Sequence, residues 1–144
     1  MACNVDRVRA ALYAKLLTWT DLPVRADTGA PAVAYPNALY TPEPDRVWVA
    51  VHFTPNVIQG TGFNMSAAVG LFLVWINVPL NAGEGAATRL QGTLAAHFYR
   101  GLRLSSSGVL TTITGGQFQT LNSSQPSWYT QGLNILWSSL YLEA

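Results

Sequence analysis

A chain of 144 residues has the usual size of one domain and is long enough to bury a core without disulfides or metal ions. Charged residues make up 10% of the sequence and hydrophobic residues 49%, whereas an average soluble protein is about 25% charged, and this composition excludes disorder. The net charge of +1 argues against affinity driven by nucleic-acid phosphates. With Cys3 as the single cysteine, no intrachain disulfide is possible, and we expect a reducing compartment.

Two long stretches, residues 47–83 and 104–142, contain no formally charged side chain. A monomer with so few charges would expose large apolar patches, so we expect an obligate oligomer in which subunits cover one another. The most apolar run, residues 67–80, has 14 residues, whereas a membrane-spanning helix needs about 20. The charges spread between Asp6 and Lys15 do not fit a secretory signal peptide.

Hydrophobic periodicity predicts the elements of the N-terminal half. Apolar residues three or four positions apart predict a first helix, with Asn4 as its N-cap. Strict alternation of β-formers predicts strands, and a run of Asn and Gly residues between two of them predicts the loop of a long hairpin. The expected elements are a helix at 5–19, a short strand at 32–35, a strand at 46–54, the hairpin loop around 55–67 and a returning strand at 68–78.

The C-terminal half adds a second helix and further strands. Glu84 lies where a carboxylate favours a helix N-terminus, and Gly101 follows the last residue at helical spacing. The expected elements are a helix at 84–100, a turn at 105–108, strands at 109–114 and 117–121 interrupted by two glycines, a loop at 122–127 and a strand at 128–142. The order predicts one α+β domain over residues 1–144, a two-layer sandwich of a mostly antiparallel sheet with two helices on one face.

Residues that could perform chemistry are few and scattered. His52 and His97 have no cysteine or acid at ligand or triad spacing, so we interpret both as surface or interface side chains. The Gly83-Glu84-Gly85 turn has the position of a dinucleotide-binding fingerprint, but it lacks the third glycine and places an anion where pyrophosphate must bind. The sequence therefore predicts no catalytic residue, no metal and no cofactor.

Several stretches nevertheless resemble the small tail terminator or tail-completion proteins of long-tailed bacteriophages. The resemblance spans nearly the whole chain and rests on the order and spacing of its motifs. They are Val8-Arg9-Ala10-Ala11-Leu12, the stretch from Val33-Ala34-Tyr35-Pro36-Asn37 to Tyr40-Thr41-Pro42, Trp48-Val49-Ala50-Val51, Gly70-Leu71-Phe72-Leu73-Val74, the turn from Val78-Pro79 to Gly83-Glu84-Gly85, Phe98-Tyr99-Arg100-Gly101-Leu102 and Trp128-Tyr129.

The resemblance implies a structural virion protein rather than an enzyme. Such subunits form a ring, usually a hexamer, that caps the head-proximal end of the tail tube, ends tube polymerisation and joins the tail to the head-completion or connector protein. DNA then only passes through the lumen, without specific contacts, and no membrane is involved. The implied location is the head–tail junction of the virion, after assembly in the host cytoplasm.

Two other functions stay open at this point. The chain could be a different head–tail joining or minor tail protein of similar size. It could also be a small-ligand-binding or enzymatic α+β domain that uses a pocket between the second helix and the sheet. His52, His97 and Glu84 would then supply the polar groups, although no spacing brings them together in the sequence.

The candidate interface residues lie on the long hairpin and the last strand. Long uncharged loops in compact domains are usually functional or disordered, and a tryptophan buried between subunits is a common hot spot. The candidate interface set is Ile58, Phe63, Met65, Trp75 and Trp137, and either tryptophan has intrasubunit core as its alternative interpretation. Arg100 and Arg103 are candidates for a basic spot that faces the lumen or a partner, with a solvated helix end as the alternative.

Overall fold

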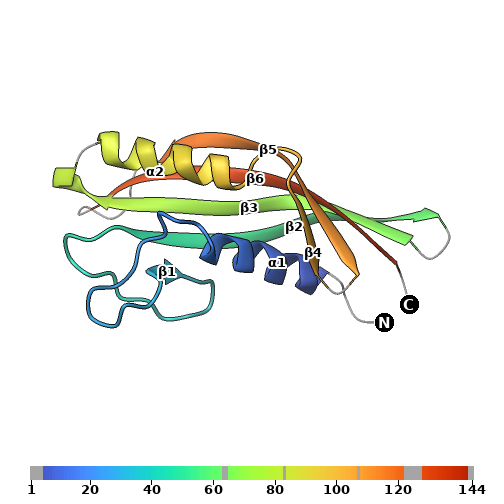
Figure 1. Cartoon of the computed structure of the whole chain (residues 1–144), viewed down its shortest axis with the longest axis horizontal. Coiled ribbons are helices and arrows are strands. Elements are labelled where there is room, and N and C mark those ends of the chain that lie inside the picture. The colour runs from blue at the N-terminus through green and yellow to red at the C-terminus, as the bar shows by residue number, and fades with distance from the viewer. Residues whose placement is uncertain (1–4, 63–64, 83, 107, 122–127, 143–144) are drawn as a thin grey trace.

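Over the residues that the structure describes, the fold consists of one mixed six-stranded sheet and two α-helices (Figure 1). The computed structural model describes residues 5–62, 65–82, 84–106, 108–121 and 128–142. The elements are α1 (Val5–Leu17), β1 (Val33–Ala34), β2 (Trp48–Gly62), β3 (Met65–Pro79), the 3-10 turn η1 (Leu80–Ala82), α2 (Glu84–His97), β4 (Arg103–Ser106), β5 (Val109–Leu121) and β6 (Trp128–Leu142). The α+β class expected from the sequence is confirmed.

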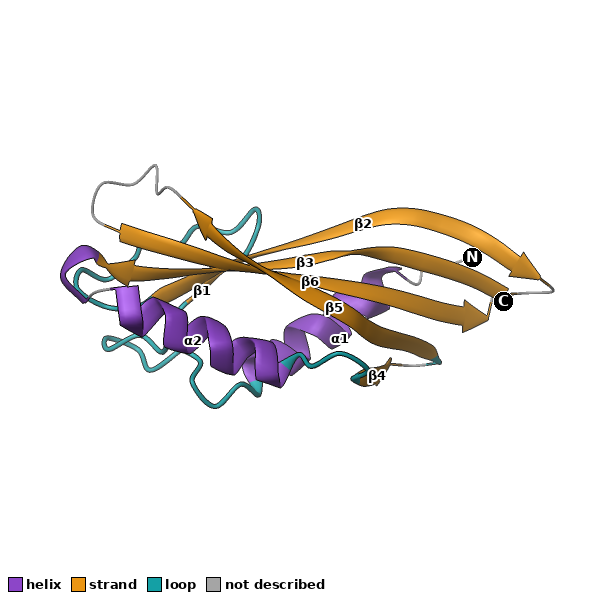
Figure 2. Cartoon of the chain, turned by 90° about the horizontal axis from the view of Figure 1, so that it is seen from above, coloured by secondary structure: helices purple, strands orange, loops and turns teal. Residues whose placement is uncertain are grey.

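The strand order in the sheet is β1-β2-β3-β6-β5-β4. Only the short β1 runs parallel to its neighbour β2, and every other pair is antiparallel. The C-terminal strand β6 therefore lies in the middle, between β3 and β5, as both views show (Figures 1 and 2). The sheet curls into a half-barrel, and the description as a two-layer sandwich is not confirmed.

Both helices cover the same face of the sheet (Figure 2). We call this face the inner face and the opposite one the outer face. The main core forms between the helices and the inner face, where Leu12 and Leu16 of α1 and Leu94 of α2 meet Phe72 and Ile76 of β3. These side chains are fully buried, so the helical stripes of apolar residues that the sequence shows are the stripes that pack.

The segment predicted as a long loop around 55–67 is mostly strand. Cα pairing between β2 and β3 continues from Trp48↔Asn77 to Gly62↔Met65. Pro55 is tolerated here because β1 covers only Val49 and Ala50 of β2, which leaves the rest of β2 as an edge strand, and because the register shifts between Pro55 and Val57. Edge strands and bulges are the places where a sheet accepts proline.

The C-terminal half departs from the expectation at three points. β5 is one continuous strand, because a bulge at Thr114, between Ile113 and Gly115, shifts the register and both glycines then pair with β6. The expected turn at 105–108 overlaps the short strand β4, which pairs with the start of β5. The second helix ends at His97, three residues earlier than expected, and Gly101 follows with φ 93°. The loop expected at 122–127 lies outside the described residues, as does Asn4.

Candidate interaction surfaces

The two histidines have different surroundings. The Nε2 of His97 donates to the carbonyl of Lys15 at 2.7 Å and lies 3.1 Å from the Thr18 hydroxyl, so its ring connects the C-terminal ends of α2 and α1. His52 is exposed on the outer face of β2. Glu84, the third polar residue of the enzymatic alternative, is exposed in the first turn of α2. The described residues contain no group of three or more His, Cys, Asp or Glu side chains that could hold a metal ion.

A double variant tests whether the histidines have only these structural roles. We expect His52→Gln with His97→Gln to leave assembly intact and to lower the free energy of unfolding by about 1 kcal/mol, the usual net value of one hydrogen bond. The single His52→Gln variant should be unchanged, since that side chain is exposed. Urea unfolding measures the first effect and virion infectivity the second. A well-folded double variant that abolishes infectivity would contradict this interpretation.

The basic pair lies between the end of α2 and the start of β4. Arg100 and Arg103 are both exposed. The turn between them is tied to β5, because the Gly101 amide donates to the carbonyl of Ile113 at 2.7 Å and the Ile113 amide donates to Leu102 at 2.8 Å. The two guanidiniums are therefore presented from a fixed turn, and their role toward a lumen or a partner stays a prediction.

The five candidate interface residues are separated by the structure. Ile58 and Met65 belong to the β2–β3 hairpin backbone, with side chains outside the described part of the chain, and Phe63 lies outside the described residues altogether. Trp137 points to the inner face, is only 1% exposed and stacks on Phe53 with ring centroids 5.3 Å apart. Its side chain is thus intrasubunit core and is not available to a neighbour.

Trp75 has the opposite placement. It pairs with Gly132 across the β3–β6 ladder, on the outer face, and 38% of its surface is exposed. Val69 of the same strand, Leu140 of β6 and Leu110 of β5 are also exposed. The Cα pairings Val69↔Ser138, Ala67↔Leu140 and Leu110↔Leu140 place these side chains on the same face as Trp75.

The four long strands of this outer face carry no formal charge, and the exposed Arg103 of β4 lies at its edge through the pairings Arg103↔Thr112 and Thr112↔Ser138. None of the residues of β2, β3, β5 and β6 is Asp, Glu, Lys or Arg, and His52 is the titratable side chain that the described part of these strands presents on this face. A contiguous apolar area of this kind marks an association surface in soluble proteins. Sequence reasoning found the absence of charge but not the face to which each strand residue points.

Segment 24–46 covers one end of the outer face. Tyr40 stacks on Trp48 at 5.5 Å, and Trp48 meets Trp128 edge-on at 5.9 Å. The Arg25 guanidinium lies 5.1 Å from the centre of the Tyr40 ring and donates to Asp27 at 3.0 Å. This pairing holds the pKa of the Asp27 carboxyl below its usual value and raises that of Arg25. A hollow of about 400 Å³ remains beside the cluster, lined by Tyr40, Trp48, His52 and Trp75 among others.

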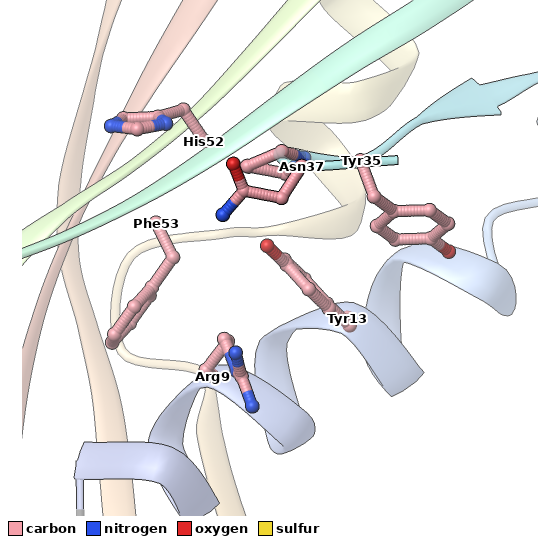
Figure 3. A pocket seen from close by; sticks show the side chains of 7 residues that line it. Arg9, Tyr13, Tyr35, Asn37, His52 and Phe53 are labelled. Carbon is pink, nitrogen blue, oxygen red and sulfur yellow. The ribbon is translucent and has the colours of Figure 1, made fainter. Parts of the chain in front are cut away.

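A second hollow of about 370 Å³ opens at the edge of β2 (Figure 3). Arg9 and Tyr13 reach it from α1, Tyr35 and Asn37 from the segment after β1, and His52 and Phe53 point to opposite sides of β2. Burial raises the pKa of the Tyr13 and Tyr35 phenols above 10.0. Both phenols therefore stay protonated at neutral pH and offer hydrogen bonds rather than a base.

These surfaces define a small α+β subunit whose distinctive feature is a sheet face of four long uncharged strands with exposed apolar side chains. The sequence matches the family model of the phage tail terminator protein over residues 7–137, and the chain belongs to that family. It is therefore a component of a bacteriophage tail, and the family resemblance expected from the sequence is confirmed. The family is one of structural proteins.

A comparison of structures agrees at the level of the fold. One solved structure is similar over 96% of both chains, with a TM-score of 0.72 and 22% sequence identity, and this shows a common fold alone. The search of curated proteins gave no match. Within the described residues, no helix is both long and apolar enough to cross a membrane.

Proposed function

We propose that this chain forms a closed ring on the head-proximal end of the phage tail tube. The ring ends tube polymerisation and presents its other side to the head-completion or connector protein. One observation supports this beyond family membership: four long strands without a single formal charge expose Val69, Trp75, Leu110 and Leu140 on one face. Copies of the subunit, or the tube, would cover that face, because heterologous contacts repeat around a ring until it closes.

The charge distribution supports a passive channel. A protein that neutralises many phosphates binds DNA tightly and in a salt-dependent way. With a net charge of +1 and eight Lys and Arg side chains in all, a ring of such subunits would let DNA slide through its lumen. We propose a hexamer as the stoichiometry.

Tube assembly in vitro tests the proposal. Purified tail tube protein should polymerise to uncontrolled lengths alone, and addition of the chain should stop growth and leave a ring on one tube end in electron micrographs. Sedimentation should show a species several times heavier than 15.6 kDa, either in solution or on tubes. A chain that stays monomeric and neither binds tube ends nor limits tube length would overturn the proposal.

The same assay separates the ring from a neighbouring role. A head–tail joining protein should bind the completed head but leave free tube growth unchanged. A minor tail protein should copurify with tails without affecting their length. Only arrest of polymerisation at a tube end distinguishes the proposed function from these two.

A further inference from the structure

Leu39 is an apolar side chain that nothing in its own subunit covers. Its exposure is 105% of the reference value, the largest among the exposed hydrophobic residues of the described chain. It lies at the tip of the segment 35–42, which we call the Leu39 loop. Complete exposure of a leucine brings no stability to the monomer, so the whole side chain is available for burial against another chain.

The Leu39 loop is held in place from both sides. The Ala38 amide donates to the carbonyl of Tyr35 at 3.3 Å, and the Arg25 guanidinium donates to the carbonyl of Thr41 at 2.7 Å. Next to Leu39, the Tyr40 ring stacks on Trp48. Because the loop is already held in one conformation, Leu39 loses little conformational freedom on binding. This favours its insertion into a hollow of a partner, and we call the side chain the knob of the contact.

A matching hollow lies at the other end of the sheet, between α2 and β5. Its volume is about 140 Å³, well below the roughly 300–1,000 Å³ of small-molecule pockets, so it suits a single side chain. Phe118 at its rim is 63% exposed. The lining is almost entirely apolar and consists of Ala95, Phe98, Arg100, Gly115, Gly116, Phe118, Leu133 and Ile135.

The glycine pair in this hollow follows directly after the bulge of β5 and adds no side chain to it. Neither Gly115 nor Gly116 has a positive φ. A Cβ at Gly115 would meet nothing within 4 Å, and one at Gly116 would make only ordinary contacts at 3.6 Å. Glycine weakens a strand, and it is found inside strands where another chain approaches the backbone closely. The pair thus leaves the backbone of β5 open to close approach by another chain at this point.

Position and charge both favour a second copy of this chain as that partner. β1 and the Leu39 loop lie at one end of the strand order, and β5 and β4 lie at the other, which is the arrangement that a head-to-tail contact needs. Residues 24–46 carry three carboxylates and two guanidiniums, which leaves one negative charge in excess, whereas Arg100 is the charged residue that lines the hollow. The charges at the two surfaces are therefore opposite in sign, which favours their contact.

We propose that Leu39 of one subunit inserts into the α2–β5 hollow of the next, against Phe118 and the Gly115–Gly116 backbone, and that this contact repeats around the ring. The inference rests on the proposed ring and names the surfaces that close it. Each subunit contributes one knob and one hollow, so the contact is heterologous and leaves no site unused in a closed ring.

Cross-linking between engineered cysteines tests the contact directly. In a Cys3→Ser background, Leu39→Cys combined with Phe118→Cys and treated with a short bis-maleimide should give a covalent ladder in steps of 15.6 kDa. Leu39→Cys alone should give no ladder, and neither should Leu80→Cys with Phe118→Cys, since Leu80 is also an exposed leucine, at 60%, but lies at the opposite end of α2. A second variant, Leu39→Asp, should raise the concentration needed for half-maximal assembly at least tenfold without changing thermal unfolding of the monomer.

The outcomes separate this contact from the ring itself. Rings that assemble without the 39–118 ladder would overturn the contact and leave the ring proposal standing. A Leu39→Asp variant that forms normal rings but no longer binds tube ends would also overturn it, because Leu39 would then face the tube protein. A wild-type chain that stays monomeric, alone and with tubes, would overturn the ring and the contact together.

Discussion

Gly70→Ala is expected to destabilise the fold by about 3 kcal/mol, the upper end of the usual cost of overpacking. Gly70 lies on β3 between Pro55 of β2 and Trp137 of β6. A Cβ at this position would come within 2.7 Å of the Trp137 ring and 3.0 Å of the Pro55 Cα, and closer still to the Thr54 carbonyl oxygen. Two of these three neighbours are backbone atoms, so no change of rotamer relieves the overlap.

Urea unfolding followed by tryptophan fluorescence measures this effect. Gly115→Ala is the matched control, because it also adds one methyl group to a strand glycine but meets nothing within 4 Å. We expect that variant to unfold within about 0.5 kcal/mol of the wild type. If Gly70→Ala and Gly115→Ala have the same stability, β2 does not approach β3 as closely as described at the Pro55 bulge.

The two tryptophans proposed from the sequence should respond to truncation in opposite ways. Trp137→Ala is expected to cost about 3–5 kcal/mol of folding free energy, the range for a fully buried aromatic side chain, because it removes the ring that stacks on Phe53. Trp75→Ala removes a partly exposed ring from the outer face and should cost less than about 1 kcal/mol in the isolated subunit. If the outer face is covered in the assembly, its loss weakens association by about 2 kcal/mol or more, as for a hot-spot tryptophan.

Two measurements on the same pair of variants distinguish these effects. Thermal or urea unfolding reports the folding term, and the amount of chain retained on tail tubes reports the association term. Trp75→Phe serves as the conservative control, since it keeps an aromatic ring on the outer face. A Trp75→Ala variant that assembles at wild-type concentration would show that this part of the outer face stays free in the virion.

Much of the fold could be predicted from the sequence, because amphipathic periodicity indicates which residues are buried. The helical stripe from Val5 to Leu16 and the alternation from Trp128 to Leu142 each predict an element that the structure contains at nearly the same residues. The absence of charge on the long strands was also predictable, because it depends only on the residues that form them. This absence in turn predicts association. The family resemblance could also be recognised from the sequence, because it rests on short local motifs and on the order in which they follow one another.

The errors fall where local preference and tertiary position disagree. Pro55, Gly60 and Gly62 favour a loop. However, no strand pairs with this part of β2 on the edge away from β3, and an edge strand tolerates residues that a central strand rejects. Likewise, the Gly115–Gly116 pair predicts an interruption, whereas β6 holds β5 on both sides of the bulge. Pairing partners distant in sequence supply the ladder hydrogen bonds in both cases, and no local window contains them.

The amino-acid sequence by itself determined the α+β class, the helices, most strands, the lack of charge on the four long strands and the family. Only the tertiary structure decided which side of the sheet the helices cover, and therefore which of Trp75 and Trp137 is buried in the core. Both residues lie on alternating strands, and the period of two states that neighbours face opposite ways without stating which way is inward. That choice, and the placement of Leu39 and the α2–β5 hollow at opposite ends of one sheet, follow from strand order, which arises from long-range packing rather than from any local pattern.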